Sequence, residues 1–116
     1  MHHACLDKAS GFCYVNDIVL AIDELLGHFR RVLYDGVETA FRRSNRVMTV
    51  SFHQRTEGFF PERRGLLEHV GEGAGRLRAV NVPMKKGMDD DGYRRLFEPI
   101  MTRVVAVFQP EAIVMQ

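Results

Sequence analysis

Short runs of β-branched and aromatic residues alternate along this chain with stretches of helical periodicity, and this alternation constrains the fold most. Four strands are predicted, at Arg31–Tyr34, Arg46–His53, Leu77–Val82 and Ala112–Met115. Strands that alternate with helices favour an α/β chain with a largely parallel sheet, because the helices serve as crossovers between parallel strands. The last run is continuously apolar, as is typical of a strand buried in a parallel sheet.

The first predicted helix carries one apolar stripe, from Tyr14 to Leu26. Apolar side chains recur there at the spacing of three and four residues that places them on one face of a helix. Ser10 or Gly11 stands where a capping residue would start the helix, and Gly27 stands where a residue would end it.

A longer helix is predicted from Asp89–Asp91 to Phe108, with Pro99 as a point where it can bend. A short helix is predicted over Val37–Phe41, and a long loop over Gln54–Gly75. Together these elements amount to a single domain, since 116 residues are too few for two hydrophobic cores.

Composition and charge exclude several classes of function. The net charge is +1, from 16 basic and 15 acidic residues, so neither nucleic acid nor a membrane surface is predicted as a direct partner. No apolar run approaches the length of a membrane span, and no signal peptide pattern is visible. Cys5 and Cys13 lack a zinc-knuckle spacing and are interpreted as reduced thiols of an intracellular protein.

Two arginine clusters stand out from this balanced charge. They are interpreted as parts of a solvated face rather than as binding sites, and they consist of Arg42, Arg43 and Arg46, and of Arg63 and Arg64.

The carboxyl ends of the predicted strands are the expected place for a ligand, as in other open parallel sheets. These ends are Tyr34-Asp35, Phe52-His53, Val82-Pro83 and Gln116. A dinucleotide site is excluded, because the glycines between positions 71 and 75 have the wrong spacing and do not follow a strand.

Two adjacent histidines, His2 and His3, precede the first predicted helix. Loops that lead into helices often carry binding or catalytic groups. By residue type alone, a histidine pair is more often solvated or structural than catalytic, although histidine titrates near neutral pH and is well suited to proton transfer.

The segment around this pair resembles the signature of the histone deacetylase family, closest to its class I members. The resemblance rests on the run HHACLDKASGFCYVNDIVLAI and then on RVLY, DGVETAF, RVMTVSFH, FFP, AVNVP and QPEAIVMQ in the family's order. It covers essentially the whole chain, which matches only a central part of the family's much longer catalytic domain. Residues 1–116 are therefore identified as an incomplete histone deacetylase catalytic domain, with part of the family's three-layer, arginase-like parallel sheet.

The resemblance also implies an activity and its partners. The family hydrolyses acetyl-lysine in histones, uses zinc and also binds potassium, and acts in chromatin to repress transcription. Acetylated histone tails and corepressor proteins are the expected partners, with the nucleus as the expected location and the cytoplasm as a second one.

The family's site residues map onto this sequence in part. His2 and His3 match the paired histidines that handle protons, and Asp35 matches the aspartate that orients the second of them, which predicts a His3–Asp35 dyad. The walls of the channel that holds the acetyl-lysine stem are matched by Gly11, Phe12 and Phe60.

The zinc-ligand segment of the family is missing. Family members carry Asp-x-Asp-x-His-His-Gly before Asp-Gly-Val-Glu, whereas here Tyr34 is followed directly by Asp35. We estimate a gap of about eight residues, which removes two zinc ligands and the aspartate that would orient His2. The third ligand and the oxyanion tyrosine would lie beyond Gln116, and Ser51 and Phe52 match remnants of a potassium site.

Three readings remain open at the level of sequence. The chain is an incomplete deacetylase, or a non-catalytic remnant that binds corepressor partners or acetylated peptides, or a generic α/β domain with unrelated chemistry. The density of family motifs disfavours the third reading, and zinc binding separates the first from the second. The shortened central strand predicts weak stability or aggregation for the isolated chain.

Overall fold

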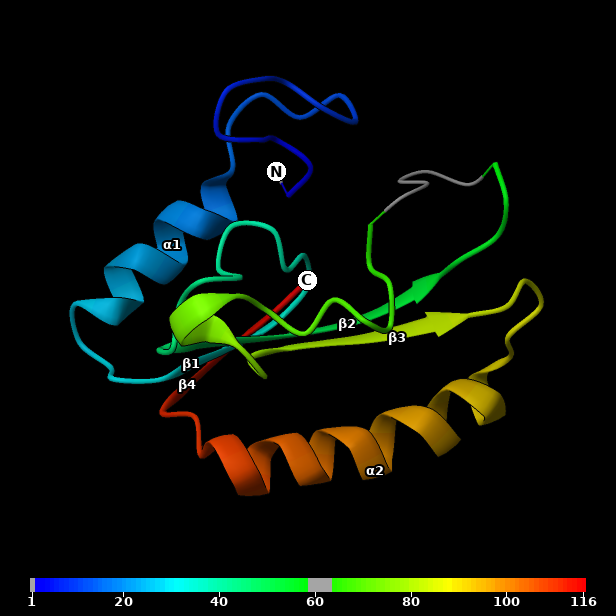
Figure 1. The fold of residues 1–116 in the computed structure, drawn as a ribbon. Helices are drawn as coiled ribbons and strands as arrows, with labels where there is room; N and C mark the ends of the chain where they lie inside the picture. Colours follow the sequence, from blue (N-terminus) through cyan, green and yellow to red (C-terminus); the bar gives the residue numbers. More distant parts are fainter. Residues whose placement is uncertain (1, 59–63) are drawn as a thin grey trace.

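The computed structural model describes residues 2–58 and 64–116, which form helices on both faces of a parallel sheet (Figure 1). In chain order the elements are α1 (Asp17–Leu26), β1 (Val32–Asp35), β2 (Val47–Gln54), the 3₁₀ turn η1 (Gly73–Gly75), β3 (Ala79–Met84), α2 (Asp90–Phe108) and β4 (Ala112–Met115). Within the described ranges, no helix is both long and apolar enough to cross a membrane.

The sheet has the strand order β3-β2-β1-β4, and each pair of neighbouring strands is parallel. Val32 of β1 lies opposite Val47 of β2 on one side and Ala112 of β4 on the other. The predicted parallel α/β architecture is therefore confirmed. The four-residue β1 is an inner strand, while β3 and β4 form the edges.

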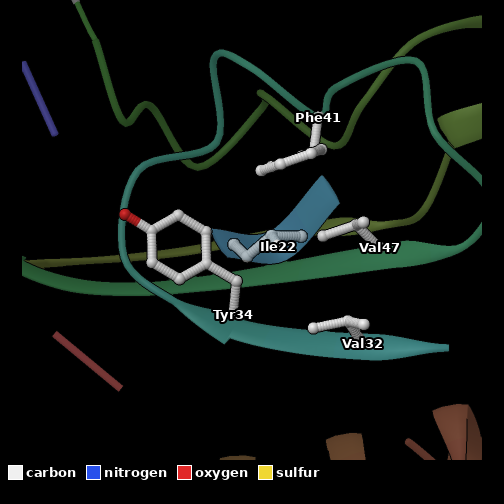
Figure 2. Close-up of a cluster of buried hydrophobic side chains, with 5 residues drawn as sticks. All are labelled: Ile22, Val32, Tyr34, Phe41 and Val47. Atoms are coloured by element: carbon white, nitrogen blue, oxygen red, sulfur yellow. The ribbon is translucent and has the colours of Figure 1, made fainter. Parts of the chain in front are cut away.

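One face of the sheet packs against α1. Ile22 of this helix is fully buried against side chains from β1, β2 and the segment that joins them, as Figure 2 shows. The cluster consists of Ile22, Val32, Tyr34, Phe41 and Val47. Burying such side chains contributes about 1.5–3 kcal/mol each to folding.

The opposite face packs against α2. The buried side chains on this face are Leu33, Met48, Val50, Val104 and Phe108. Because successive residues of a strand point to opposite faces, Val32 and Tyr34 pack on the α1 side of the sheet, whereas Leu33 packs on the α2 side. The chain therefore forms three layers, as expected for a partial histone deacetylase fold. Because both faces of the sheet are covered, β1 carries apolar residues on both of its sides instead of alternating apolar and polar ones.

The first helix begins later than predicted, at Asp17. Its N-cap is Asn16, whose side chain accepts a hydrogen bond from the Val19 amide at 3.2 Å. Ser10 and Gly11 do not cap the helix. They belong to a tight turn closed by reciprocal backbone hydrogen bonds between Ser10 and Cys13. The prediction was wrong because asparagine, a strong capping residue, stands closer to the apolar stripe.

The short helix predicted over Val37–Phe41 is absent, and turns occupy that segment. The Phe41 amide donates to Glu38 O at 3.1 Å, and the Ser44 amide donates to Phe41 O at 2.8 Å. Five residues gain too few hydrogen bonds to offset helix nucleation. Asp35, the expected cap, is instead the last residue of β1.

The third strand also differs from its predicted bounds. Leu77 has a φ of 64°, a left-handed conformation that cannot continue a strand, so β3 begins at Ala79. Pro83 does not end β3, because it pairs with His53 of β2 and the strand continues to Met84. Proline is tolerated there because β3 is an edge strand, whose outer hydrogen-bonding groups need no partner in the sheet.

Candidate functional site

A cleft of about 790 Å³ opens at the carboxyl ends of the strands. Its lining includes Ser51 in the second half of β2, Asn81 of β3 and Gln116 just after β4, together with His2 and His3 from the loop before α1. The ligand site expected at this edge of the sheet thus has a physical counterpart, and the histidine pair lies in it.

The loop that carries the histidine pair is attached to the start of α1. Asn16 Nδ2 donates to His2 O and to Ala4 O, each at 3.4 Å, while the other end of the same side chain caps the helix. The two imidazole rings lie side by side, with ring centroids 4.0 Å apart. The position of His2 therefore depends on a residue that also starts a helix.

The surroundings of His3 favour its neutral form. Burial lowers the pKa of its imidazole, and the neighbouring His2 and the Arg64 guanidinium lower it further. A histidine with a lowered pKa carries no proton on one ring nitrogen at neutral pH and can accept one there. This matches the proton-accepting role implied by the family resemblance, which stays a prediction.

Gly11 lies against the His3 ring. Its φ is 54°, and a Cβ on this residue would come within 2.9 Å of His3 side-chain atoms. Phe12 follows with a φ of 60° and is 95% exposed at the tip of the turn. Phe12 is not among the described residues that line the cleft, and the channel-wall role of Gly11 and Phe12 stays a prediction. The third wall residue, Phe60, lies outside the described residues.

Asp35 lies at the end of β1 with its side chain on the α2 side, since it alternates with Tyr34. Burial raises the pKa of the Asp35 carboxyl. The charge of Asp35 in turn helps to raise the pKa of Tyr93, after the larger effect of burial of that phenol. The predicted dyad with His3 remains untested.

The two residues assigned to a potassium remnant have other contacts. Ser51 Oγ lies 3.0 Å from His53 Nδ1, and His53 Nε2 lies 2.9 Å from the Gly65 carbonyl oxygen. Because a carbonyl only accepts, Nε2 carries the hydrogen and the Ser51 hydroxyl donates to Nδ1. Phe52 packs against Phe97 of α2, with ring centroids 5.1 Å apart. The potassium assignment stays a prediction.

A half-buried polar network in the wall of the cleft was not predicted from the sequence. His69 Nδ1 lies 3.1 Å from Glu38 Oε1, and Asn81 Nδ2 donates to Glu38 Oε2 at 2.7 Å and to His69 O at 2.9 Å. Its members come from three segments that only the strand order brings together. The network fixes the segment after β1 against β3.

The residues present do not fit a zinc ion. Among the described parts of the chain, no three histidine, cysteine, aspartate or glutamate side chains come together as metal ligands would. A catalytic zinc needs three protein ligands and an open position. The chain as described therefore offers no donor set for the metal that its family resemblance implies.

Comparison with known proteins identifies the family. A profile for the histone deacetylase domain matches residues 1–116. The chain is 52% identical to histone deacetylase 1 of Homo sapiens and to histone deacetylase 6 of Arabidopsis thaliana, and 51% identical to histone deacetylase 9 of Arabidopsis thaliana. Each match includes the whole of this chain, but only 25%, 26% and 29% of the respective relative. The chain thus spans about a quarter of the length of these relatives.

These alignments also bear on the missing segment. Each runs over 124 residues, eight more than the 116 of this chain. That difference agrees with the gap of about eight residues estimated from the sequence. The match of residues 1–116 to the histone deacetylase domain, together with 51–52% identity to these relatives over the whole chain, shows that the chain belongs to the histone deacetylase family.

Proposed function

We propose that this chain is part of a zinc-dependent deacetylase that removes acetyl groups from lysine in histones, and that these 116 residues alone bind acetyl-lysine without hydrolysing it. The main support for this proposal is the position of His2 and His3 in the cleft at the carboxyl ends of the strands. Membership of the histone deacetylase family supplies the substrate class.

The chemistry of the cleft supports binding. The neutral imidazole of His3 offers a hydrogen-bonding nitrogen without the cost of burying a charge. The cleft volume of about 790 Å³ lies in the usual range for small-molecule sites. An acetylated lysine, which is uncharged, suits such a cleft better than a free ammonium group.

Hydrolysis is a different matter for this chain. A deacetylase of this kind needs a metal to generate hydroxide from water at neutral pH. The described residues provide no group of three metal ligands. We therefore assign no hydrolytic step to them, and we place the zinc ligands in the segment missing after Tyr34 and in sequence beyond Gln116.

The partners and location follow from the same proposal. Acetylated histone tails are the proposed ligand, corepressor proteins the proposed partners, and the nucleus the proposed location, with the cytoplasm second. A second candidate function is a non-catalytic remnant that binds such partners or peptides. It is supported by the finding that residues 2–58 and 64–116 form no cluster of three metal-ligating side chains.

Peptide binding tests the proposal directly. Titration calorimetry with a histone-tail peptide should show that the acetyl-lysine form binds at least about tenfold more tightly than the lysine form. This ratio corresponds to a difference of about 1.4 kcal/mol in the free energy of binding. His3→Gln should remove this preference. His28→Gln, which changes an exposed histidine beyond α1, should leave it intact.

Acetate release from the same peptide completes the test. We expect none from this chain, with or without added zinc. Equal binding of both peptides would overturn the recognition part of the proposal. Acetate release that persists in a chelator would overturn the assignment of hydrolysis to a metal held by residues outside this chain.

A further inference from the structure

A chain of two hydrogen bonds joins the buried face of β1 to the histidine pair. The Tyr34 hydroxyl donates to Gln116 Oε1, and Gln116 Nε2 contacts His2 Nδ1. The three residues come from β1, from the position after β4 and from the loop before α1, and are up to 114 positions apart in sequence. The β1–β4 pairing places Tyr34 beside the end of β4, and the loop before α1, which Asn16 holds through His2 O, brings His2 to Gln116.

The orientation of the Gln116 amide follows from Tyr34. Tyr34 is 2% exposed, and burial raises the pKa of its phenol, so the hydroxyl stays protonated at neutral pH. The ring is fixed from below by Gly36, where any Cβ would overlap it, and from the side by Phe41, edge-on at 6.4 Å. A fixed hydroxyl that donates selects the carbonyl oxygen of Gln116 and turns its amide nitrogen toward His2.

An amide nitrogen can only donate, so His2 Nδ1 must accept. The ring hydrogen of neutral His2 is then on Nε2. A carboxylate at the same place would have the opposite effect, because it only accepts and would hold the hydrogen on Nδ1. The residue at position 116 thus decides whether Nε2 of His2 donates or accepts.

We propose that Gln116, supported by Tyr34, is the positioning residue of His2 and fixes it as a hydrogen-bond donor through Nε2. It contacts His2 Nδ1 in a chain whose missing segment would, by the family resemblance, have supplied an aspartate to orient His2. This inference rests on the proposed function, because the group that such a donor suits is the carbonyl oxygen of an acetylated lysine. His2 then binds the acyl oxygen, while neutral His3 is the proton acceptor of the pair.

Nitrogen-15 NMR of the histidine side chains tests the tautomer without any ligand. At about pH 8.5, where histidine is neutral, two-bond proton–nitrogen correlations of the full 116-residue chain should show His2 with its hydrogen on Nε2. Gln116→Glu should move the hydrogen to Nδ1, and Gln116→Ala should give a mixture of both forms. Gln54→Glu, which adds a carboxylate to the same cleft away from His2, should leave the His2 pattern unchanged.

The same spectra report whether the variant chains are folded. His53, with its hydrogen held on Nε2 by the Gly65 carbonyl, serves as the internal reference and should not change. If Gln116→Glu alters the His53 signals, the variant Tyr34→Phe is measured instead. Loss of the Tyr34 hydroxyl should weaken the preference of the His2 ring hydrogen for Nε2.

Two results would overturn the inference: a hydrogen on Nδ1 of His2 in the unaltered chain, or a His2 tautomer that is the same in Gln116→Glu as in the unaltered chain with His53 intact. A chain that shows the expected tautomers but binds both peptides equally would refute the proposed function and leave the role of Gln116 standing.

Discussion

At the scale of single residues, Gly11 determines where His3 can lie. Its left-handed φ, and the His3 side-chain atoms that a Cβ on Gly11 would meet at 2.9 Å, disfavour any side chain at this position. Gly11→Ala should lower the free energy of unfolding by about 2–3 kcal/mol, as the sum of left-handed strain and a steric clash. Urea denaturation measures this loss.

Gly73 provides the matched control for this substitution. It has a φ of 51°, close to that of Gly11, but open space where a Cβ would be. Gly73→Ala should therefore cost only the backbone strain, about 1 kcal/mol. Equal losses in the two variants would show that the His3 ring does not restrict position 11.

Asp35 gives a prediction about pH. Burial raises the pKa of its carboxyl above 3.8, so the folded chain binds the proton more tightly than the unfolded chain. The ionised carboxyl therefore costs stability at neutral pH, and this cost disappears as the pH falls below 3.8, where both states are protonated.

Asp35→Asn should accordingly be more stable than the unaltered chain at pH 7, and the difference should shrink to nothing in acid. Urea midpoints measured between about pH 3 and pH 7 test this, with Asp7→Asn in the exposed N-terminal loop as the control. A difference that does not change with pH would mean that the Asp35 carboxyl is not the cause.

The site was predictable from sequence only in part at this scale. The histidine pair and the strand ends were identified, because motif and periodicity are local signals. Gln116 was identified as a strand end but not as the partner of His2, and Glu38 and His69 were not identified at all. Their contacts depend on which strands are neighbours, and a single sequence does not give that order.

At the scale of elements, Arg46 connects the end of α1 to the start of β2. Its guanidinium donates to Leu26 O and Phe29 O, and its Nε donates to Arg30 O at 3.2 Å. Leu26 is the last residue of α1, and carbonyls in the last turn of a helix have no partner within the helix, whereas Phe29 and Arg30 follow the helix. The interpretation of Arg46 as part of a solvated cluster was therefore incomplete, because its exposed side chain also hydrogen-bonds to carbonyls at the end of α1 and in the segment that follows.

Arg46→Met should lower the free energy of unfolding by about 1–2 kcal/mol, since three carbonyls lose a charged donor. Arg43→Met is the matched control. Arg43 belongs to the same predicted cluster and forms an exposed ion pair with Glu72, at 3.1 Å, and its replacement should cost less than about 1 kcal/mol. Urea denaturation of both variants tests the difference, and similar small losses would argue against a capping role for Arg46.

The helices and strands themselves followed largely from the sequence. Strand runs at Val47–Gln54 and Ala112–Met115 and the long helix Asp90–Phe108 lie within one or two residues of their predicted bounds. Two of the errors occurred where a single residue decided the boundary: Asn16 capped α1 six residues after Ser10, and the left-handed backbone of Leu77 delayed the start of β3. Caps and left-handed residues set the ends of elements independently of hydrophobic periodicity, so the periodicity of the sequence does not reveal them.

At the scale of the whole molecule, the chain exposes more surface than a compact domain of its mass. Its accessible surface is 7971 Å², whereas a compact monomer of 13.3 kDa exposes roughly 6,450 Å². Some of the excess is apolar and lies on the edge strand β4, where Ile113 is 52% and Met115 69% exposed. An open strand edge with apolar side chains favours association with other chains.

The isolated chain should therefore melt below about 50 °C and associate as its concentration rises. The low melting temperature and the association have the same cause. The inner strand β1 has only four residues, so it can form few hydrogen bonds with its neighbours β2 and β4. Circular dichroism melts together with light scattering over a range of protein concentrations measure them. Inserting an eight-residue segment that contains Asp-x-Asp-x-His-His-Gly between Tyr34 and Asp35 should raise the melting temperature, since it lengthens β1, whereas eight glycine and serine residues at the same point should not. A cooperative melt of the unaltered monomer well above 50 °C would show that four residues are enough for the centre of this sheet.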